Sequence, residues 1–305
     1  MNLFEATPAS DRTYGLAEGP VWDADRLRVL WVDVNAGTVY VGRFSDGAIN
    51  QEHHIAVDTT VGAVVTSASG DLLVAGARHL HTISSDGAHH RGLEVVARTK
   101  ESRLNDGGCD PEGRFLVGSL ALDQRQGDES LVRIEPDGAV TVIDDDLTLS
   151  NGLAFSPDDT VLYNIDTTPG TVWRRSYGLG SGVVGPRAEF VHIDHGSPDG
   201  MCIDNDGNLW IAIWGAGEVR CFAPSGEQLA TVVVAAPNTS SVAFIGPNLD
   251  TLLITTASEQ LSPADSTRYP DSGRLFTADV GVAGTPVHRW AGQLGTQPRS
   301  VISSA

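Results

Sequence analysis

The sequence is poor in cysteine and contains no long apolar run. Its 305 residues include three cysteines, Cys109, Cys202 and Cys221, which form neither a C-x-x-C pair nor an even set. This pattern does not support a disulfide framework and fits reduced, buried thiols in a reducing compartment. No segment approaches the roughly 20 apolar residues of a membrane helix, and the N-terminus lacks both a basic start and an apolar run. We therefore expect a cytoplasmic protein that does not enter a membrane.

Basic residues are also scarce. The chain has 20 lysine and arginine residues against 39 aspartate and glutamate residues, a formal charge of -19. A surface with this excess of negative charge repels a phosphate backbone, so nucleic acid is not an expected partner. The 34 glycines and 15 prolines are spread along the chain, and 41% of the residues are apolar. These values exclude disorder and collagen-like repetition and indicate a globular protein rich in turns.

Six turn-then-strand units recur along the chain, each with a large apolar residue in the same place. These residues are 42, 42, 48, 47 and 43 positions apart, and they are Trp31, Leu73, Phe115, Tyr163, Trp210 and Leu253. A second alternating segment that ends in a Gly-containing turn follows each unit, so every unit contains at least two hairpins. No long stretch shows the 3.6-residue period of a helix.

Six units of about 45 residues match the repeat length of four-stranded propeller blades. The sequence therefore predicts an all-β fold, a six-bladed β-propeller with four antiparallel strands per blade. Because the repeat fills nearly the whole chain, we expect a single domain over residues 1–305. We also expect residues 2–7 (NLFEAT) to add an outer strand to the blade formed by the C-terminal segments, which would remove a free sheet edge.

One position of the repeat is rich in polar residues. The six residues at this position, five of them followed by glycine, are Glu18, Val61, Asp106, Asn151, Asp199 and Ser240. Taken singly, each can be an ordinary strand-entry residue, because Asp, Asn and Ser favour turns. If the position begins the innermost strand of each blade, three carboxylates converge on the axis and repel one another unless a cation lies between them. Oxygen ligands without histidine or cysteine point to a hard cation such as Ca²⁺, Mg²⁺ or Mn²⁺.

Five stretches carry a more specific signal. They are AEGPVWD at 17–23, SRLNDGGCDPEGRFLVGS at 102–119, SNGLAFSPDDTVLYNIDT at 150–167, SPDGMCIDNDGNLWIA at 197–212 and NTSSVAF at 238–244. In this order and combination the chain resembles the SMP-30/gluconolactonase/LRE family, to which regucalcin and bacterial sugar lactonases belong. The resemblance implies that Glu18, Asn151 and Asp199 hold one divalent metal ion. Ca²⁺ is favoured, with Mg²⁺, Mn²⁺, Zn²⁺ and Fe²⁺ as alternatives.

The same resemblance implies substrate contacts. Arg103 and Asn105 match the family's R-x-N motif, and Asp123 is the nearest match to an acidic residue that touches sugar hydroxyls in some members. In the family Asn105, not Asp106, is the functional residue, so the repeat register can be displaced by one position in this blade. Two residues of the fifth unit are further candidates for the site: His195 as an auxiliary acid or base, and Trp214 as part of the pocket wall.

The implied reaction is hydrolysis of a sugar lactone to its aldonic acid. The metal would polarise the carbonyl oxygen, and Asp199 would serve as both ligand and general base toward the attacking water. Arg103 and Asn105 would fix the sugar over the ion. The chain has no G-x-S-x-G elbow for covalent catalysis.

Two other functions stay open at this point. The same metal site suits hydrolysis of an organophosphate or an aryl ester, because a polarised P=O group needs similar support to a polarised C=O group. A non-catalytic, calcium-binding propeller is the third reading. The expected partner of the enzyme is a small-molecule lactone, and we expect a monomer or a weak homo-oligomer.

Overall fold

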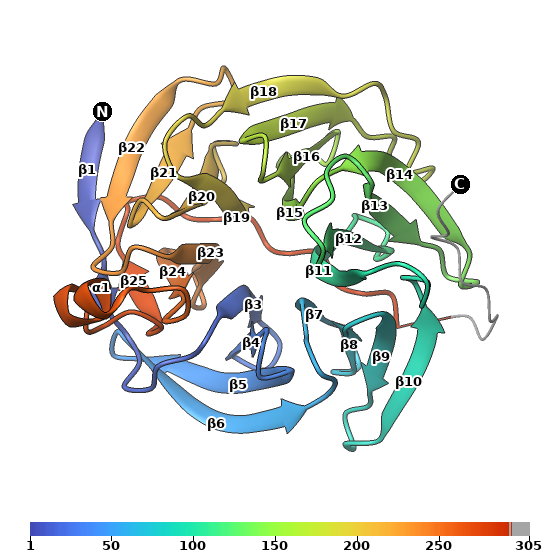
Figure 1. The fold of residues 1–305 in the computed structure, drawn as a ribbon, viewed down its shortest axis with the longest axis horizontal. Helices are drawn as coiled ribbons and strands as arrows, with labels where there is room; N and C mark the ends of the chain where they lie inside the picture. Colours follow the sequence, from blue (N-terminus) through green and yellow to red (C-terminus); the bar gives the residue numbers. More distant parts are fainter. Residues whose placement is uncertain (293, 295–305) are drawn as a thin grey trace.

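The fold is a ring of six small sheets around a central axis (Figure 1). This computed structural model describes residues 1–292 and 294. Each sheet forms one blade, and the strands of a blade follow one another outward from the axis. The architecture confirms the predicted six-bladed β-propeller built from four-stranded antiparallel blades.

Blades one to four each consist of four consecutive strands. Blade one contains β3 (Ala17–Asp23), β4 (Arg28–Asp33), β5 (Thr38–Ser45) and β6 (Ala48–Ala56). Blade two contains β7 (Ala63–Thr66), β8 (Leu72–Ala75), β9 (His79–Ile83) and β10 (His89–Glu94). Blade three contains β11 (Ser102–Cys109), β12 (Phe115–Ala121), β13 (Glu129–Ile134) and β14 (Val140–Leu147). Blade four contains β15 (Ser150–Phe155), β16 (Val161–Asp166), β17 (Thr171–Ser176) and β18 (Ala188–His192).

Blades five and six share the N-terminal segment. Blade five contains β19 (Ser197–Ile203), β20 (Leu209–Trp214), β21 (Glu218–Phe222) and β22 (Gln228–Val233), and β1 (Asn2–Glu5) lies parallel to β22 as a fifth strand. Blade six contains β23 (Thr239–Ile245), β24 (Thr251–Thr256) and β25 (Phe276–Ala278), and β2 (Thr7–Pro8) lies antiparallel outside β25.

This arrangement corrects the expectation for residues 2–7. The sequence predicted one outer strand in the last blade, but residues 2–5 belong to blade five and the last blade takes Thr7 and Pro8. Two backbone hydrogen bonds hold the crossing: Ala6 N donates to the Val233 carbonyl at 2.9 Å and Ala9 N donates to the Leu275 carbonyl at 2.7 Å. The segment therefore covers the outer edges of two blades at once.

The repeated large apolar residues form the core between blades. All six lie on the second strand of the repeat and are buried, with exposed fractions of 5% or less: Trp31, Leu73, Phe115, Tyr163, Trp210 and Leu253. Trp31 and Leu253 share one cluster across blades one and six, and Leu73 and Phe115 share another across blades two and three. Each such side chain stabilises the packing by about 1.5–3 kcal/mol.

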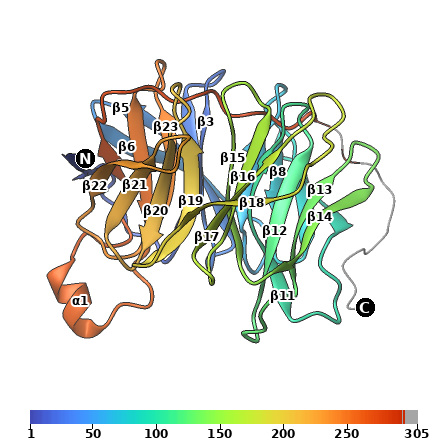
Figure 2. The same cartoon turned by 90° about the horizontal axis from the view of Figure 1, so that it is seen from above.

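The two faces of the ring carry different structures (Figure 2). On one face, the loop after β24 contains the short helix α1 (Pro263–Arg268), whose N-cap Ser262 accepts a hydrogen bond from Asp265 N. On the opposite face, residues 284–290 cross the axis as a strap. Gly284 N at one end donates to the Leu249 carbonyl and Trp290 N at the other end donates to the Thr66 carbonyl, both at 2.9 Å. Within the described residues, no helix has the length and apolar character needed to cross a membrane.

Candidate active site

The innermost strands are irregular at the motif that the sequence singled out. The pairing register shifts between Glu18 and Val21 in β3, between Leu104 and Gly107 in β11, and between Asn151 and Leu153 in β15. Strands β19 and β23 show the same kind of shift, after Pro198 and Thr239. Bulges of this kind change the direction of a side chain locally. Five of the six blades therefore have an irregular inner strand at this position of the repeat.

Three predicted metal ligands lie together at the start of these strands. Glu18, Asn151 and Asp199 are 9%, 5% and 6% exposed. Asn151 Nδ2 donates a hydrogen bond to Asp199 Oδ1 and a second one, at 3.1 Å, to Thr167 Oγ1. The Thr167 hydroxyl donates in turn to the Pro198 carbonyl at 2.8 Å. Blades four and five are thus connected by a polar chain beside the axis.

The carboxylates of this site repel one another. Burial, followed by the charges of Asp199 and Asp106, raises the pKa of Glu18 well above its ordinary value. Burial and the charge of Asp106 likewise raise the pKa of Asp199, against the hydrogen bond from Asn151. Burial raises the pKa of Asp106 to about 6. Three acidic side chains from blades one, three and five therefore share one poorly solvated space.

The remaining two positions of the repeat do not extend this acidic group. Val61 is fully buried in an apolar cluster between blades one and two. The Ser240 hydroxyl donates to the Ala17 carbonyl at 2.5 Å and so connects blade six to blade one. Asp106 lies with the acidic residues, as the repeat register of the motif predicted for this blade.

The residues present fit a hard divalent cation. The described residues include no group of three or more His, Cys, Asp or Glu side chains arranged to hold a metal ion. An ion at this site would therefore bind the amide oxygen of Asn151 in addition to the carboxylates of Glu18 and Asp199. Both hydrogen bonds of the Asn151 side chain use Nδ2, which leaves Oδ1 available as a ligand. A divalent charge would also remove the repulsion that raises the pKa values of Glu18 and Asp199.

Arg103 and Asn105 lie next to this acidic group. Arg103 Nη1 donates to the Leu104 carbonyl at 2.9 Å and to Asn105 Oδ1 at 2.7 Å, and Asn105 Nδ2 donates to the Ser150 carbonyl at 3.0 Å. Burial lowers the pKa of Arg103 to about 10, although the charges of Glu18, Glu259 and Asp199 oppose this shift. The R-x-N motif is therefore held by hydrogen bonds. It lies close enough to Glu18 and Asp199 for their charges to affect the pKa of Arg103.

Asp123, the third predicted substrate contact, has different neighbours. Its carboxylate pairs with Arg125 at 2.7 Å, and Arg125 also donates to the fully buried Glu129 at 3.0 Å. No hydrogen bond or ion pair of the described residues connects Asp123 to Arg103 or Asn105. Its role in substrate binding stays a prediction.

Glu259 is an acidic residue near this site that neither the repeat nor the family motifs indicated. It lies in the loop between β24 and α1, and its carboxylate is close enough to Arg103 for each charge to affect the pKa of the other. The loop between β24 and β25 is longer than the corresponding loops of the other five units, so the repeat could not identify Glu259. Of the other candidates, His195 is exposed. Trp214 is the last residue of β20, and its backbone forms a β-bridge with Asn238, the residue before β23.

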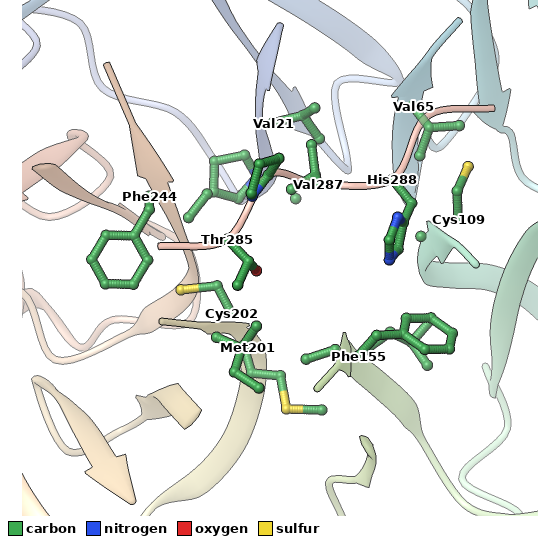
Figure 3. A pocket seen from close by; sticks show the side chains of 18 of the residues that line it. Val21, Val65, Cys109, Phe155, Met201, Cys202, Phe244, Thr285, Val287 and His288 are labelled. Atoms are coloured by element: carbon green, nitrogen blue, oxygen red, sulfur yellow. The ribbon is translucent and has the colours of Figure 1, made fainter. Parts of the chain in front are cut away.

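A cavity of about 480 Å³ lies between the inner strands of the ring (Figure 3). Gly19 and Asp106 are among its lining residues, and most of the wall is apolar, with Phe155, Met201 and Phe244 among the larger side chains. The strap crosses this cavity and contributes Thr285, Val287 and His288 to its lining. His288 Nε2 is bonded to Asp159 Oδ1 at 2.8 Å, which fixes the strap to blade four. The predicted ligands thus lie at the end of the channel that is away from the strap.

The chain is similar to several known proteins over almost its full length. Regucalcin of Gallus gallus is 32% identical over 295 residues, which cover 93% of this chain and 97% of the relative. A pentonolactonase of Haloferax volcanii is 33% identical over 296 residues, which cover 95% of this chain and 99% of the relative. The crystal structure of a calcium-binding protein, regucalcin from Agrobacterium tumefaciens, matches with a TM-score of 0.87 at 25% identity and covers 95% of this chain and 99% of its own. The model of the SMP-30/gluconolactonase/LRE-like region matches residues 16–258, and the chain belongs to this family.

Proposed function

We propose that this protein hydrolyses sugar lactones to aldonic acids with one divalent metal ion held by Glu18, Asn151 and Asp199. The observation that supports this most is the buried cluster in which Asn151 bonds Asp199 while Glu18 and Asp106 share the same space. The pentonolactonase name of one relative and the calcium-binding title of one solved structure point in the same direction. Ca²⁺ is the ion we expect.

Each residue has a defined task in this reaction. A bound divalent ion would supply Lewis-acid polarisation of the lactone carbonyl oxygen. Asp199 accepts a proton from the attacking water, and Asn151 holds the carboxylate of Asp199 in place through its amide. The guanidinium of Arg103 and the amide of Asn105 bind oxygen atoms of the sugar, so that the carbonyl carbon stays in reach of the water.

The cysteines support the predicted compartment. All three are free thiols, with Cys109 and Cys221 buried and Cys202 half-buried. Unpaired thiols are typical of a reducing environment, which supports the cytoplasm as the place of the reaction.

A lactone panel tests the proposed function. Five- and six-carbon aldonolactones are incubated with the protein and hydrolysis is followed with a pH indicator, first as purified, then after chelation, and then with each divalent ion added back. We expect turnover that chelation removes and Ca²⁺ restores. Turnover of aryl esters or organophosphates but not of lactones would favour the second reading. Calcium binding without turnover of any of these substrates would favour a calcium-binding propeller.

A further inference from the structure

One carboxylate of blade three is fully buried, although the proposed reaction does not use it. Glu129 is the first residue of β13, and its side chain is 0% exposed. Its Oε1 accepts a hydrogen bond from Ser102 Oγ at 2.6 Å, and its Oε2 accepts one from Ser119 Oγ at 2.5 Å. Ser102 is the first residue of β11 and Ser119 lies in β12. Glu129 thus joins three strands of the blade through its side chain.

Two cations lie beside this carboxylate. Arg125 Nη2 donates to Glu129 Oε1 at 3.0 Å and to Ser102 Oγ at 2.8 Å. The side chain of Lys100 is 6% exposed, and its Nζ lies 3.6 Å from Glu129 Oε1. A buried charge without such partners is strongly destabilising, and a hydrogen bond between charged groups is about twice as strong as a neutral one. The charge of Glu129 therefore contributes much of the attachment of Arg125.

Arg125 belongs to the loop 122–128, which connects β12 to β13 and lies beside the predicted site. Leu122 N donates to the carbonyl of Glu101, the residue before β11, at 2.8 Å. Gly127 N donates to the hydroxyl of Thr148, between β14 and β15, at 3.1 Å. The loop 122–128 therefore extends from the strand of the R-x-N motif toward the strand of a predicted metal ligand.

The outer side of the loop is polar and accessible. Arg125 Nη1 donates to Asp123 Oδ2 at 2.7 Å, and Arg125 Nε lies 3.2 Å from Asp128 Oδ2. The side chains of Arg125 and Asp123 are 30% and 34% exposed, so a molecule in solution can reach them but cannot reach Glu129. Arg125 is thus the connection between the accessible surface of the loop and the buried carboxylate.

We propose that Glu129 is a positioning residue for substrate binding: it holds Arg125 and so keeps the loop 122–128 as a wall beside the R-x-N motif. This inference rests on the proposed function and adds to it a residue that touches neither substrate nor metal. Among the described residues, no hydrogen bond or ion pair joins Glu129 or Arg125 to the three predicted metal ligands. Loss of the Glu129 charge should therefore weaken substrate binding and leave metal affinity and the chemical step unchanged.

The test is a double-mutant cycle on the lactone that is hydrolysed fastest. kcat and KM are measured for the wild type, Glu129→Gln, Arg125→Ala and the double variant. Glu129→Gln keeps the size of the side chain, and replacing a charged hydrogen bond by a neutral one corresponds to about 3- to 10-fold in an equilibrium constant. We expect KM to rise by this factor in Glu129→Gln and at least as much in Arg125→Ala, with kcat changed by less than about twofold.

The double variant decides whether Glu129 acts through Arg125. If it does, KM of the double variant equals that of Arg125→Ala within about twofold. Effects of the two substitutions that multiply would overturn the proposal, as would a wild-type KM in Glu129→Gln. Arg125→Ala changes a partly exposed side chain and serves as the second test if Glu129→Gln does not fold. A wild-type KM in Arg125→Ala overturns the proposal as well.

Glu135→Gln is the matched control. Glu135 follows the other end of β13, and its carboxylate pairs with Arg133 at 2.7 Å and with Arg114 at 3.8 Å. This change removes the same charge from blade three without a contact to the loop 122–128. We expect wild-type kcat and KM in Glu135→Gln, and a wild-type Kd for Ca²⁺ in every variant. An equal rise of KM in the control, or a large loss of calcium affinity in Glu129→Gln, would show that Glu129 has no specific role in substrate binding.

Limited proteolysis separates this proposal from the proposed function, because it needs no turnover. Trypsin cleaves after arginine, and cleavage between Arg125 and Gln126 requires that Arg125 leave its partners and the loop open. The rate of this cleavage is measured by mass spectrometry for the wild type, Glu129→Gln and Glu135→Gln. A rate at least about threefold higher in Glu129→Gln alone supports the attachment of the loop even if no lactone is hydrolysed. Equal rates in the three proteins overturn it.

Discussion

Asn151 and Asp199, 48 residues apart in the chain, are joined by a hydrogen bond at the start of two neighbouring inner strands. The bond orients the carboxylate to which we assign two tasks, metal binding and proton transfer. It also leaves the amide oxygen of Asn151 for the ion. The effects of changing Asp199 should therefore depend on whether metal is present.

Asp199→Ala should abolish lactone hydrolysis and remove most of the stabilisation by metal. With metal at 100 times its Kd, the wild type gains about 2.7 kcal/mol in unfolding free energy, which the variant should lose. In chelator the variant should melt at or above the wild-type temperature, because one of three repelling carboxylates is gone. Thermal melts with and without Ca²⁺ measure both effects, and Glu227→Ala, an exposed position, is the control. Wild-type turnover in Asp199→Ala would remove its catalytic assignment.

Arg103→Ala should weaken substrate binding and leave the metal site intact. The guanidinium is bonded to Leu104 and Asn105 and not to the predicted ligands Glu18, Asn151 or Asp199. We expect KM to rise about 10-fold or more, since a hydrogen bond to a charged group is lost, while the Kd for Ca²⁺ changes little. Steady-state kinetics and calcium titration measure the two quantities separately. A large loss of calcium affinity would show that Arg103 supports the metal site instead.

His81→Gln should make stability less dependent on pH. The imidazole is 3% exposed, with Nε2 at 3.2 Å from Asp58 Oδ2 and Nδ1 at 3.0 Å from His89 Nε2. Burial lowers the pKa of His81 against the opposing effect of Asp58, so the folded state binds this proton at lower pH than the unfolded state does. The resulting stability is complete above the unfolded pKa of about 6.5 and is lost as the pH falls from there toward the lowered folded value.

Urea unfolding between pH 7.5 and pH 5, in chelator, measures this difference. One histidine contributes a slope of at most about 1.4 kcal/mol per pH unit, and we expect His81→Gln to reduce the total slope by part of this amount. His54→Gln, at an exposed position on β6, should keep the wild-type slope. Parallel stability curves for His81→Gln and the wild type would contradict the prediction.

Deletion of residues 1–8 should destabilise the ring by about 2–4 kcal/mol. The deletion removes the backbone pairing of β1 with β22 and of β2 with β25, together with the contacts of Phe4 with the core cluster of blades five and six. Urea unfolding monitored by tryptophan fluorescence measures the loss. Leu3→Ser is the control, because this side chain is 69% exposed and its loss should cost less than about 0.5 kcal/mol. Unchanged stability after the deletion would show that the outer strands are dispensable.

The repeat made most of the fold predictable. Large apolar residues such as Trp31 and Trp210 recur at a nearly regular spacing because each blade packs one such side chain on its second strand. The repeat is therefore visible in the sequence. The N-terminal crossing was less predictable, since a short strand can pair with either of two neighbouring blades. Its partner depends on backbone hydrogen bonds such as Ala6 to Val233, which composition does not encode.

Candidate site residues could be predicted only where they belong to the repeat or to a family motif. Glu18, Asn151 and Asp199 stand at equivalent positions of the repeat, so one alignment of the sequence with itself groups them. Val61 and Ser240 stand at the same position but serve in packing and in a blade-to-blade hydrogen bond. Glu259 lies in a loop that is longer than its counterparts in the other blades, and the bridge between Ala257 and Leu16 places the start of this loop beside β3.

The division of the N-terminal segment between two blades has a consequence for biosynthesis. Residues 2–5 are synthesised before their partner strand, which ends at Val233, and Thr7 and Pro8 are synthesised before theirs, which ends at Ala278. At about 5–20 residues per second, the leading segment stays unpaired for roughly ten seconds or longer. Blades one to four can form during translation, whereas the ring closes only after β25 has been synthesised. The unpaired strands β1 and β2 should therefore be open to wrong pairing with other nascent chains until β22 and β25 have been synthesised.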